Sequence, residues 1–203
     1  MLVKIRKRTI LSVICTLVLS ASLLSAGAAQ ADPFERTASG WINPTNVDVN
    51  GNGRTISVIT TYGKGAFGTS VSNSTTEVND PDPTQRFCSP PSPTNVVIRL
   101  PLLARSTVTR FHNGDLLFAT LDLDPLVSSA LCVDISNQTT LSEVHMVITG
   151  GTGKFAGATG TLLITTNGTQ LHFEDGLNVH SGITEFTEGE IFLNHYDDDD
   201  NDD

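Results

Sequence analysis

The glycine-rich segment 148–161, which reads ITGGTGKFAGATGT, constrains the fold more than any other stretch of this chain. It has two interpretations, a loop that binds phosphate or a tight corner between strands. A dinucleotide-binding glycine loop needs a helix directly after it, and a P-loop lysine is followed by Ser or Thr. Here Lys154 precedes Phe155, and the following residues, ATGTLLITT, are rich in β-branched side chains. The segment therefore predicts a corner between two antiparallel strands, and nucleotide binding is not expected.

Glycine suits such a corner because it adopts positive φ and lets two backbones approach closely. In this interpretation the ring of Phe155 plugs one end of a small barrel. We expect a structural role, rather than contact with a ligand, for Gly150, Gly151, Gly153, Phe155, Gly157 and Gly160.

The rest of the chain has the periodicity of strands. No window after residue 31 sustains the apolar repeat of a helix, whereas runs rich in β-branched and aromatic residues recur. These runs are 55–62, 95–100, 106–112, 115–123, 141–149, 160–166, 169–176 and 189–193. Asn-Gly pairs at 113–114 and 167–168 are typical of two-residue hairpin turns. Alternating apolar and polar positions favour an antiparallel sheet around a core, as a closed barrel or a sandwich.

The N-terminal residues form a basic, then apolar, then small-residue segment that is typical of a secretory signal peptide. We expect residues 1–31 to be removed before Asp32, which makes the mature protein secreted or periplasmic and leaves no membrane anchor. A lipid anchor on Cys15 is the alternative, but it fits poorly because Ile14 stands where a small residue is expected.

The mature chain is long enough for one domain with its own core. We expect a polar N-terminal segment at 32–54 and a β-barrel domain at 55–196. The proline-rich stretch 79–94 is expected to form a long loop on the barrel rim. The acidic tail 197–203 is a run of like charges and is expected to be disordered.

The charge balance excludes one class of partner. The chain has 12 basic and 22 acidic residues, a formal net charge of −10, and four of the basic residues lie in the signal segment. An acidic surface without a basic patch repels nucleic acid and anionic lipid. We therefore expect no nucleic-acid partner and no attachment to a membrane after signal cleavage.

Two cysteines, Cys88 and Cys132, remain after the signal segment is removed. An even number of cysteines in an oxidising compartment predicts one disulfide, which would tie the proline-rich loop to the barrel. Two buried free thiols are the alternative.

The segment ITGGTGKFAGATGTLLI resembles the signature of the dirigent and allene oxide cyclase-like barrels, including their exported bacterial members, and NGDLLFATLDL is similar to a family strand. The resemblance covers residues 114–192. It implies an all-β fold, an eight-stranded antiparallel β-barrel, with homo-oligomers among the relatives. Characterised relatives cyclise an unsaturated epoxide, or guide the coupling of phenolic radicals, in an apolar lumen without a cofactor. Their acidic catalytic positions do not match positions of this chain. The shared motif indicates the fold rather than an activity, because the glycine corner belongs to the scaffold and not to the cavity.

Candidate ligand-binding residues are few. Glu143 with His145, and His172 with Glu174, form two polar pairs on strands that could be neighbours. They would form a site if they shared a face, but cross-strand pairs on a solvated outer face are the alternative. Asp122 could serve as an acid if it faced an apolar lumen. Because no histidines have metal-ligand spacing, we expect neither a metal nor a cofactor.

Two functions are consistent with the sequence. The first is a secreted barrel that binds a small apolar, aromatic or phenolic molecule, or serves as a non-catalytic extracellular module. The second is a cofactor-independent isomerase or cyclase, or a dirigent-type coupling guide. The lumen discriminates between them, because a catalytic barrel should bury an ionisable side chain against an apolar ligand pocket. We favour the first.

Overall fold

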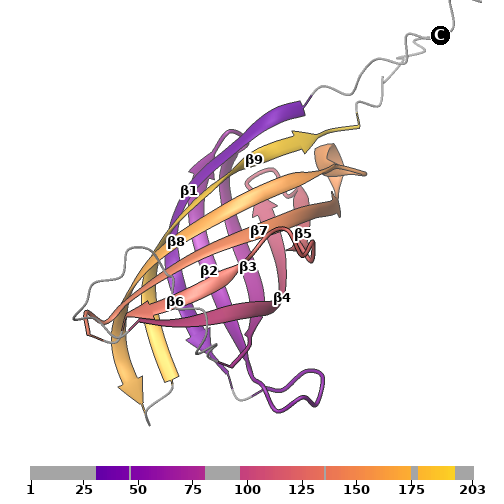
Figure 1. Cartoon of the computed structure of the whole chain (residues 1–203). Coiled ribbons are helices and arrows are strands. Elements are labelled where there is room, and N and C mark those ends of the chain that lie inside the picture. The colour runs from indigo at the N-terminus through magenta and orange to yellow at the C-terminus, as the bar shows by residue number, and fades with distance from the viewer. Residues whose placement is uncertain (1–30, 46, 81–96, 135, 175–177, 195–203) are drawn as a thin grey trace, which may run out of the picture. The chain divides into compact units, whose positions relative to one another are not determined.

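The computed structural model describes residues 31–45, 47–80, 97–134, 136–174 and 178–194, with the backbone alone at 170–181 (Figure 1). Every described residue belongs to one compact unit, Ala31–Asp203. The signal peptide except its last residue, Cys88, most of the proline-rich loop and the acidic tail therefore lie outside the described residues.

Nine strands make up the described part of the chain. They are β1 (Ala31–Pro44), β2 (Ile56–Gly65), β3 (Gly68–Val78), β4 (Val97–Phe111), β5 (Leu116–Leu121), β6 (Ala130–Asp134), β7 (Thr139–Gly151), β8 (Thr159–Glu174) and β9 (Asn178–Phe192). A 3₁₀ turn, η1 (Gly153–Phe155), lies between β7 and β8. Each strand pairs with its neighbours in antiparallel fashion.

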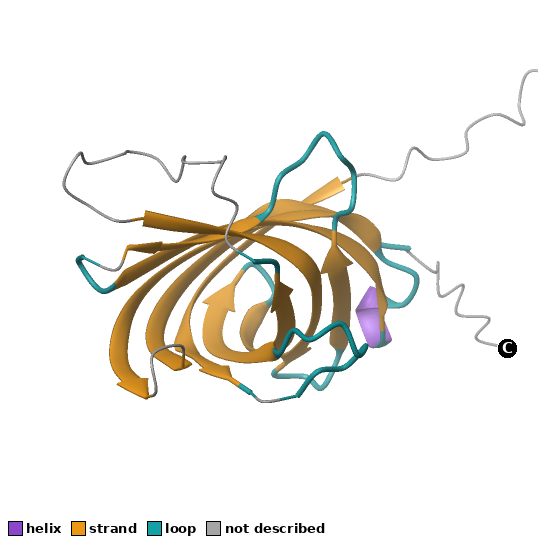
Figure 2. Cartoon of the chain, turned by 60° about the horizontal axis from the view of Figure 1, so that its bottom comes forward, coloured by secondary structure: helices purple, strands orange, loops and turns teal. Residues whose placement is uncertain are grey.

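The sheet closes on itself as a barrel with eight strand positions (Figure 2). The order is β3-β2-β1-β9-β8-β7-β5-β4, and β3 also pairs with β4, which completes the ring. β5 and β6 share one position, because β5 pairs with one half of β4 and β7 while β6 pairs with the other half of each. The predicted eight-stranded antiparallel β-barrel is confirmed, with one strand interrupted by residues 122–129.

The segment 32–54 differs from its prediction, because most of it is the barrel strand β1. Eleven residues of the segment pair with β9, and nine pair with β2. Phe34, Arg36 and Ala38 are buried at alternating positions, while Glu35 and Thr37 between them are exposed. The alternation has the correct period, but an arginine occupies one inward position, so the apolar pattern was too weak to reveal a strand.

The strand β3 was missed for the same physical reason. Its inward positions are hydroxyl side chains rather than apolar ones, namely Ser70, Ser72, Ser74 and Thr76. Its sequence therefore has no hydrophobic period of two, although Ser and Thr lie in a regular strand paired on both edges.

The two Asn-Gly pairs have different outcomes. Gly114 has φ of +93° between β4 and β5, so a turn is present there, but the connection spans the four residues 112–115 and Asn113 does not have positive φ, so it is not the predicted two-residue turn. Gly168 instead lies inside β8, paired with Thr140 and Ile183. A Cβ at Gly168 would lie 2.2 Å from Oγ1 of Thr140. The predicted turn at 167–168 is therefore wrong, and glycine serves there to make room for a side chain on the neighbouring strand.

The glycine-rich segment forms the corner between β7 and β8. Gly150, Gly153, Gly157 and Gly160 all have positive φ. Phe155, at the end of η1, is fully buried, and its ring centroid lies 4.7 Å from that of Phe111 and 5.3 Å from that of Phe67. The positive φ angles direct the chain from one strand to the next and place an aromatic side chain in the core.

The interior of the barrel has an apolar half and a polar half. Most inward residues of β5, β7 and β8 are aliphatic or methionine, namely Leu117, Ala119, Leu121, Val144, Met146, Ile148, Leu162 and Ile164. The buried polar residues of these strands are Thr140, Ser142 and Thr166. Inward residues of β2, β3 and β4 are mostly polar, namely Thr61, Ser70, Ser72, Ser74, Thr76, Arg105, Thr107 and Thr109. This division places charged groups inside the barrel and makes the lumen the first place to look for a site.

Candidate functional site in the barrel lumen

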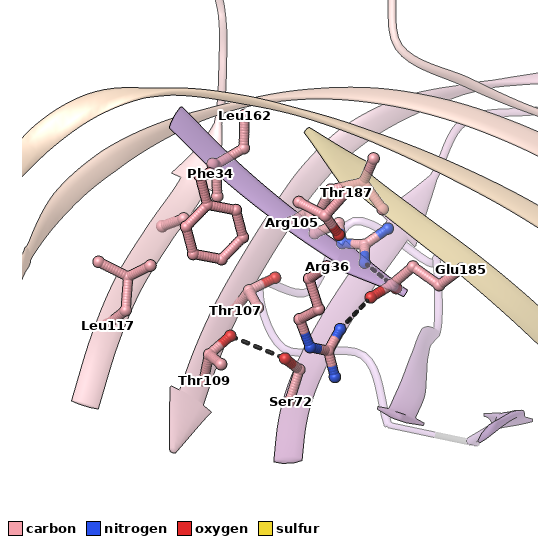
Figure 3. A pocket seen from close by; sticks show the side chains of 12 residues that line it. Phe34, Arg36, Ser72, Arg105, Thr107, Thr109, Leu117, Leu162, Glu185 and Thr187 are labelled. Carbon is pink, nitrogen blue, oxygen red and sulfur yellow. Dashed lines mark hydrogen bonds and ion pairs between the residues drawn. The ribbon is translucent and has the colours of Figure 1, made fainter. Parts of the chain in front are cut away.

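Arg36 projects from β1 into the lumen and is almost fully bonded there (Figure 3). Its Nη1 donates to Oε1 of Glu185 at 2.6 Å, and its Nε donates to Oγ of Ser70 at 2.8 Å. Its Nη2 donates to the carbonyl and hydroxyl oxygens of Thr61 at 3.2 and 3.1 Å. A Cβ at Gly63 would lie 2.9 Å from Nε of Arg36, so a glycine on β2 makes room for the guanidinium group.

Arg105 enters the same lumen from β4, with weaker partners. Its Nη2 lies 3.6 Å from Oε2 of Glu185 and 3.5 Å from Oγ of Ser74. Its Nε is buried and has no hydrogen-bond partner among the described residues. The cluster of Arg36, Arg105 and Glu185 thus carries two positive charges and one negative charge.

Burial works against the charged form of both arginines. Loss of hydration lowers the pKa of Arg36 and of Arg105 from the ordinary value, and the attraction and hydrogen bonding of Glu185 oppose this shift. Arginine nevertheless stays protonated in proteins, so the lumen retains an excess positive charge. Glu185 is the group that offsets most of the cost of burying that charge.

Two hydroxyl pairs cross-link the polar half of the lumen. Ser72 and Thr109 share a hydrogen bond of 2.7 Å between their side-chain oxygens, and Ser74 and Thr107 share one of 2.8 Å. Both pairs join β3 to β4. Buried hydroxyls satisfied in this way stabilise the strand pair rather than remain available to a ligand.

Little free space remains between the two halves of the lumen. The enclosed cavity beside Phe34, Arg36, Arg105, Leu117 and Glu185 measures about 20 Å³. That volume holds about one water molecule, whereas small-molecule sites occupy roughly 300–1,000 Å³. This cavity is therefore too small for an apolar or phenolic ligand in this conformation.

The residues proposed from the sequence do not gather into one site. Glu143 and His145 lie on the outer face of β7, with Oε1 and Nε2 at 3.7 Å and side chains 64% and 31% exposed. Asp122 lies just after β5, where its Oδ1 accepts the amide of Asp124. The side chains of His172 and Glu174 lie outside the described residues.

Sequence reasoning missed the three charged lumen residues. Arg36 falls in a segment that was expected to lie outside the barrel, and Glu185 falls between two predicted strands. The signal that could have found Arg36 is its position between Phe34 and Ala38 in an alternating run.

A shallow groove on the outer wall has a different composition. Its lining includes Tyr62, Lys64, Arg110 and His112 from the region of β2, β3 and β4, and it measures about 700 Å³. Tyr62 is 52% exposed, and its ring centroid lies 5.8 Å from that of Trp41. The groove therefore presents aromatic surface and basic groups on an otherwise acidic chain.

Within the described ranges, no group of three or more His, Cys, Asp or Glu side chains is placed so that it could hold a metal ion. Cys132 lies half-buried in β6, and its predicted bridge to Cys88 stays a prediction because Cys88 lies outside the described residues. Among the helices of the described residues, none has the length and apolar character needed to span a membrane.

Comparison with known proteins assigns neither a family nor a function to the chain. No protein-family model matches the chain, and no curated protein matches it. Among solved structures, a pterocarpan synthase dirigent protein is similar over 81% of this chain and 88% of its own, with 13% sequence identity and a TM-score of 0.20. A likeness of this strength assigns no function, and the barrel rests on the strand pairing described above.

Proposed function

We propose that the protein is an exported, non-catalytic binding module that recognises a small aromatic acid on its outer wall and uses the barrel as a rigid scaffold. The observation that carries this proposal is the free volume of the lumen, about 20 Å³. A ligand of ten heavy atoms needs more than ten times that space.

Among the side chains that the structure describes, the lumen also lacks a carboxylate that is free to act on a substrate. Oε1 of Glu185 accepts bonds from Arg36 and Thr61, and Oε2 faces Arg105. A general acid or base must reach the reacting proton directly or through one water. The arrangement therefore favours a structural ion cluster over the cyclase or coupling-guide alternative.

The outer groove has the chemistry that an aromatic acid requires. Tyr62 offers an exposed ring for stacking, while Lys64 and Arg110 can bind a carboxylate through charge-assisted hydrogen bonds. Tyr62 and Lys64 lie on β2, and Arg110 lies on β4 with β3 between them, because Tyr62 pairs with Val71 on β3, which in turn pairs with Arg110. Closed strand pairing holds the groove in place without a ligand, so little ordering cost accompanies binding.

A titration with 4-hydroxybenzoate, followed by amide chemical shifts, tests this proposal. We expect saturable shifts at Tyr62, Lys64 and Arg110. Tyr62→Ala should weaken the affinity about five-fold, since an aromatic contact contributes about 1 kcal/mol. Leu123→Ala, which removes an even more exposed apolar side chain outside the groove, should leave the affinity unchanged. Saturable shifts confined to lumen residues, or equal effects of the two variants, would overturn the proposal.

A further inference from the structure

The connection between β1 and β2 contains the sequence DVNGNGR at residues 48–54. Asp48, Asn50, Asn52 and Gly53 occupy the first, third, fifth and sixth positions of a calcium-loop motif, in which alternate residues supply oxygen ligands and a glycine makes the sharp turn. This spacing is specific, because it requires three oxygen-bearing side chains and one glycine at fixed intervals.

The backbone of this connection has the fold that the motif needs. Gly51 and Gly53 have φ of +73° and +84°. The carboxylate of Asp48 accepts the amide of Gly51 through Oδ1 and that of Gly53 through Oδ2, each at 2.7 Å. The loop is therefore wrapped around the side chain of its first residue.

The glutamate that normally ends a calcium loop is missing from the loop itself. Its place, the twelfth residue counted from Asp48, is taken by Ile59, which is buried in the barrel wall. A glutamate from another strand stands beside the loop instead. The register pairs Ile56 on β2 with Glu77 on β3, and Oε2 of Glu77 lies 3.1 Å from Nδ2 of Asn50. Oε1 of Glu77 accepts Nδ2 of Asn52.

The burial of Glu77 is an independent sign of a cation. The residue is only 6% exposed, and no lysine, arginine or histidine forms an ion pair with it among the described residues. Arg54, the nearest basic residue in sequence to the loop, pairs with Asp80 at 2.8 Å. Buried carboxylates are normally paired with a positive charge or bound to a metal, because burying an unpaired charge is costly.

We propose that residues 48–54 and Glu77 together bind one calcium ion. The ligands are the carboxylate of Asp48, the side-chain oxygens of Asn50 and Asn52, the backbone carbonyl of Arg54 and the carboxylate of Glu77. In the ion-free structure Oδ1 of Asn50 accepts the amide of Asn52, and Oδ1 of Asn52 accepts the amide of Arg54. Calcium binding therefore requires both asparagine side chains to rotate, so that their oxygens face the ion and these two backbone amides are released to water. The ion neutralises Asp48 and Glu77 and fastens the β1–β2 connection to β3. This site is separate from the outer groove and does not depend on the proposed function.

The expected affinity is modest. Two carboxylates and two amides give less negative charge than the sites of intracellular calcium sensors, and dissociation constants of about 10⁻⁴–10⁻³ M are typical of extracellular calcium modules. Magnesium should bind less well, because it demands near-ideal octahedral geometry and gives up its water ligands reluctantly.

Thermal unfolding of the chelator-treated protein in calcium chloride or magnesium chloride tests the site. With 10 mM calcium we expect Tm to rise by about 3–6 °C, and by less with magnesium. Glu77→Gln keeps the shape of the side chain and removes its charge, so it should abolish the calcium response, measured as the difference in Tm between the calcium-loaded and metal-free forms of the same variant. Glu188→Gln, on an exposed position of β9, should respond to calcium like the wild type.

Two further measurements separate this site from weak binding by the acidic tail. The amide signals of Gly51 and Gly53 should shift and saturate with calcium. A variant that ends at Asn194 should keep the full response. The proposal is overturned if Glu77→Gln retains the calcium response, if removal of the tail abolishes it, or if the two glycine signals do not move.

Discussion

Replacement of Glu185 by glutamine tests whether one negative charge holds the lumen cluster together. Oε1 of Glu185 lies 2.6 Å from Nη1 of Arg36, and Oε2 lies 3.6 Å from Nη2 of Arg105, with all three side chains at most 4% exposed. Glutamine has the same shape and keeps a hydrogen-bond acceptor, but it leaves two guanidinium charges buried without a counter-charge. Removing one partner of a buried ion pair costs about 3–5 kcal/mol, and we expect the free energy of unfolding to fall by that amount.

A second substitution shows which arginine accounts for most of the stability that Glu185→Gln removes. Arg105 is the worse-paired group, because its Nε has no partner among the described residues and its contact with Glu185 is long. Adding Arg105→Met to Glu185→Gln should therefore recover at least half of the lost stability. Adding Arg36→Met should recover less, because it also removes the hydrogen bonds to Ser70 and Thr61.

Urea unfolding, followed by circular dichroism and Trp41 fluorescence, measures these differences, with an unchanged m-value as the sign that the unfolded state is not altered. Glu188→Gln on the exposed face of β9 is the matched control and should stay within about 0.5 kcal/mol of the wild type. A loss below about 1 kcal/mol for Glu185→Gln would refute the reasoning, since it would place the charge in a solvated environment.

Three further outcomes follow from the fold and the sequence. Phe155→Ala should lower the free energy of unfolding by about 3–5 kcal/mol, because it empties a fully buried aromatic position; urea unfolding measures it. Intact-mass analysis with and without reductant should reveal one bridge between Cys88 and Cys132, and its reduction should cost about 3–4 kcal/mol. The exported protein should begin at Asp32, which N-terminal sequencing reads directly; an N-terminus that retains the apolar segment would contradict signal cleavage.

The sequence predicts the apolar half of the barrel well and the polar half poorly. Strand β7 was predicted because Val144, Met146 and Ile148 alternate with outward residues, and each of the three is buried. Strand β3 could not be predicted in this way, because Ser and Thr occupy its inward positions and resemble a loop. Hydrophobic periodicity reports a strand only where the lumen beside it is apolar.

The candidate sites depend on pairings that a sequence does not show. Arg36 and Glu185 are 149 residues apart, and they meet because β1 and β9 close the barrel side by side. The spacing of the loop at 48–53 was not recognised as a calcium motif in the sequence, which was expected to bind no metal, and its proposed final ligand, Glu77, becomes visible only through the register of β2 with β3. A sequence can show a motif of neighbouring residues, whereas partners that lie far apart in the chain are identified only from the strand pairing.

The central claim is that the lumen is filled and that ligands bind outside it. A crystal structure of the protein grown with 4-hydroxybenzoate measures this most directly. The account predicts at most one water molecule beside Arg105 and the aromatic acid in the groove of Tyr62 and Arg110. Electron density for the aromatic ring between Leu117 and Arg105, inside the barrel, would contradict it.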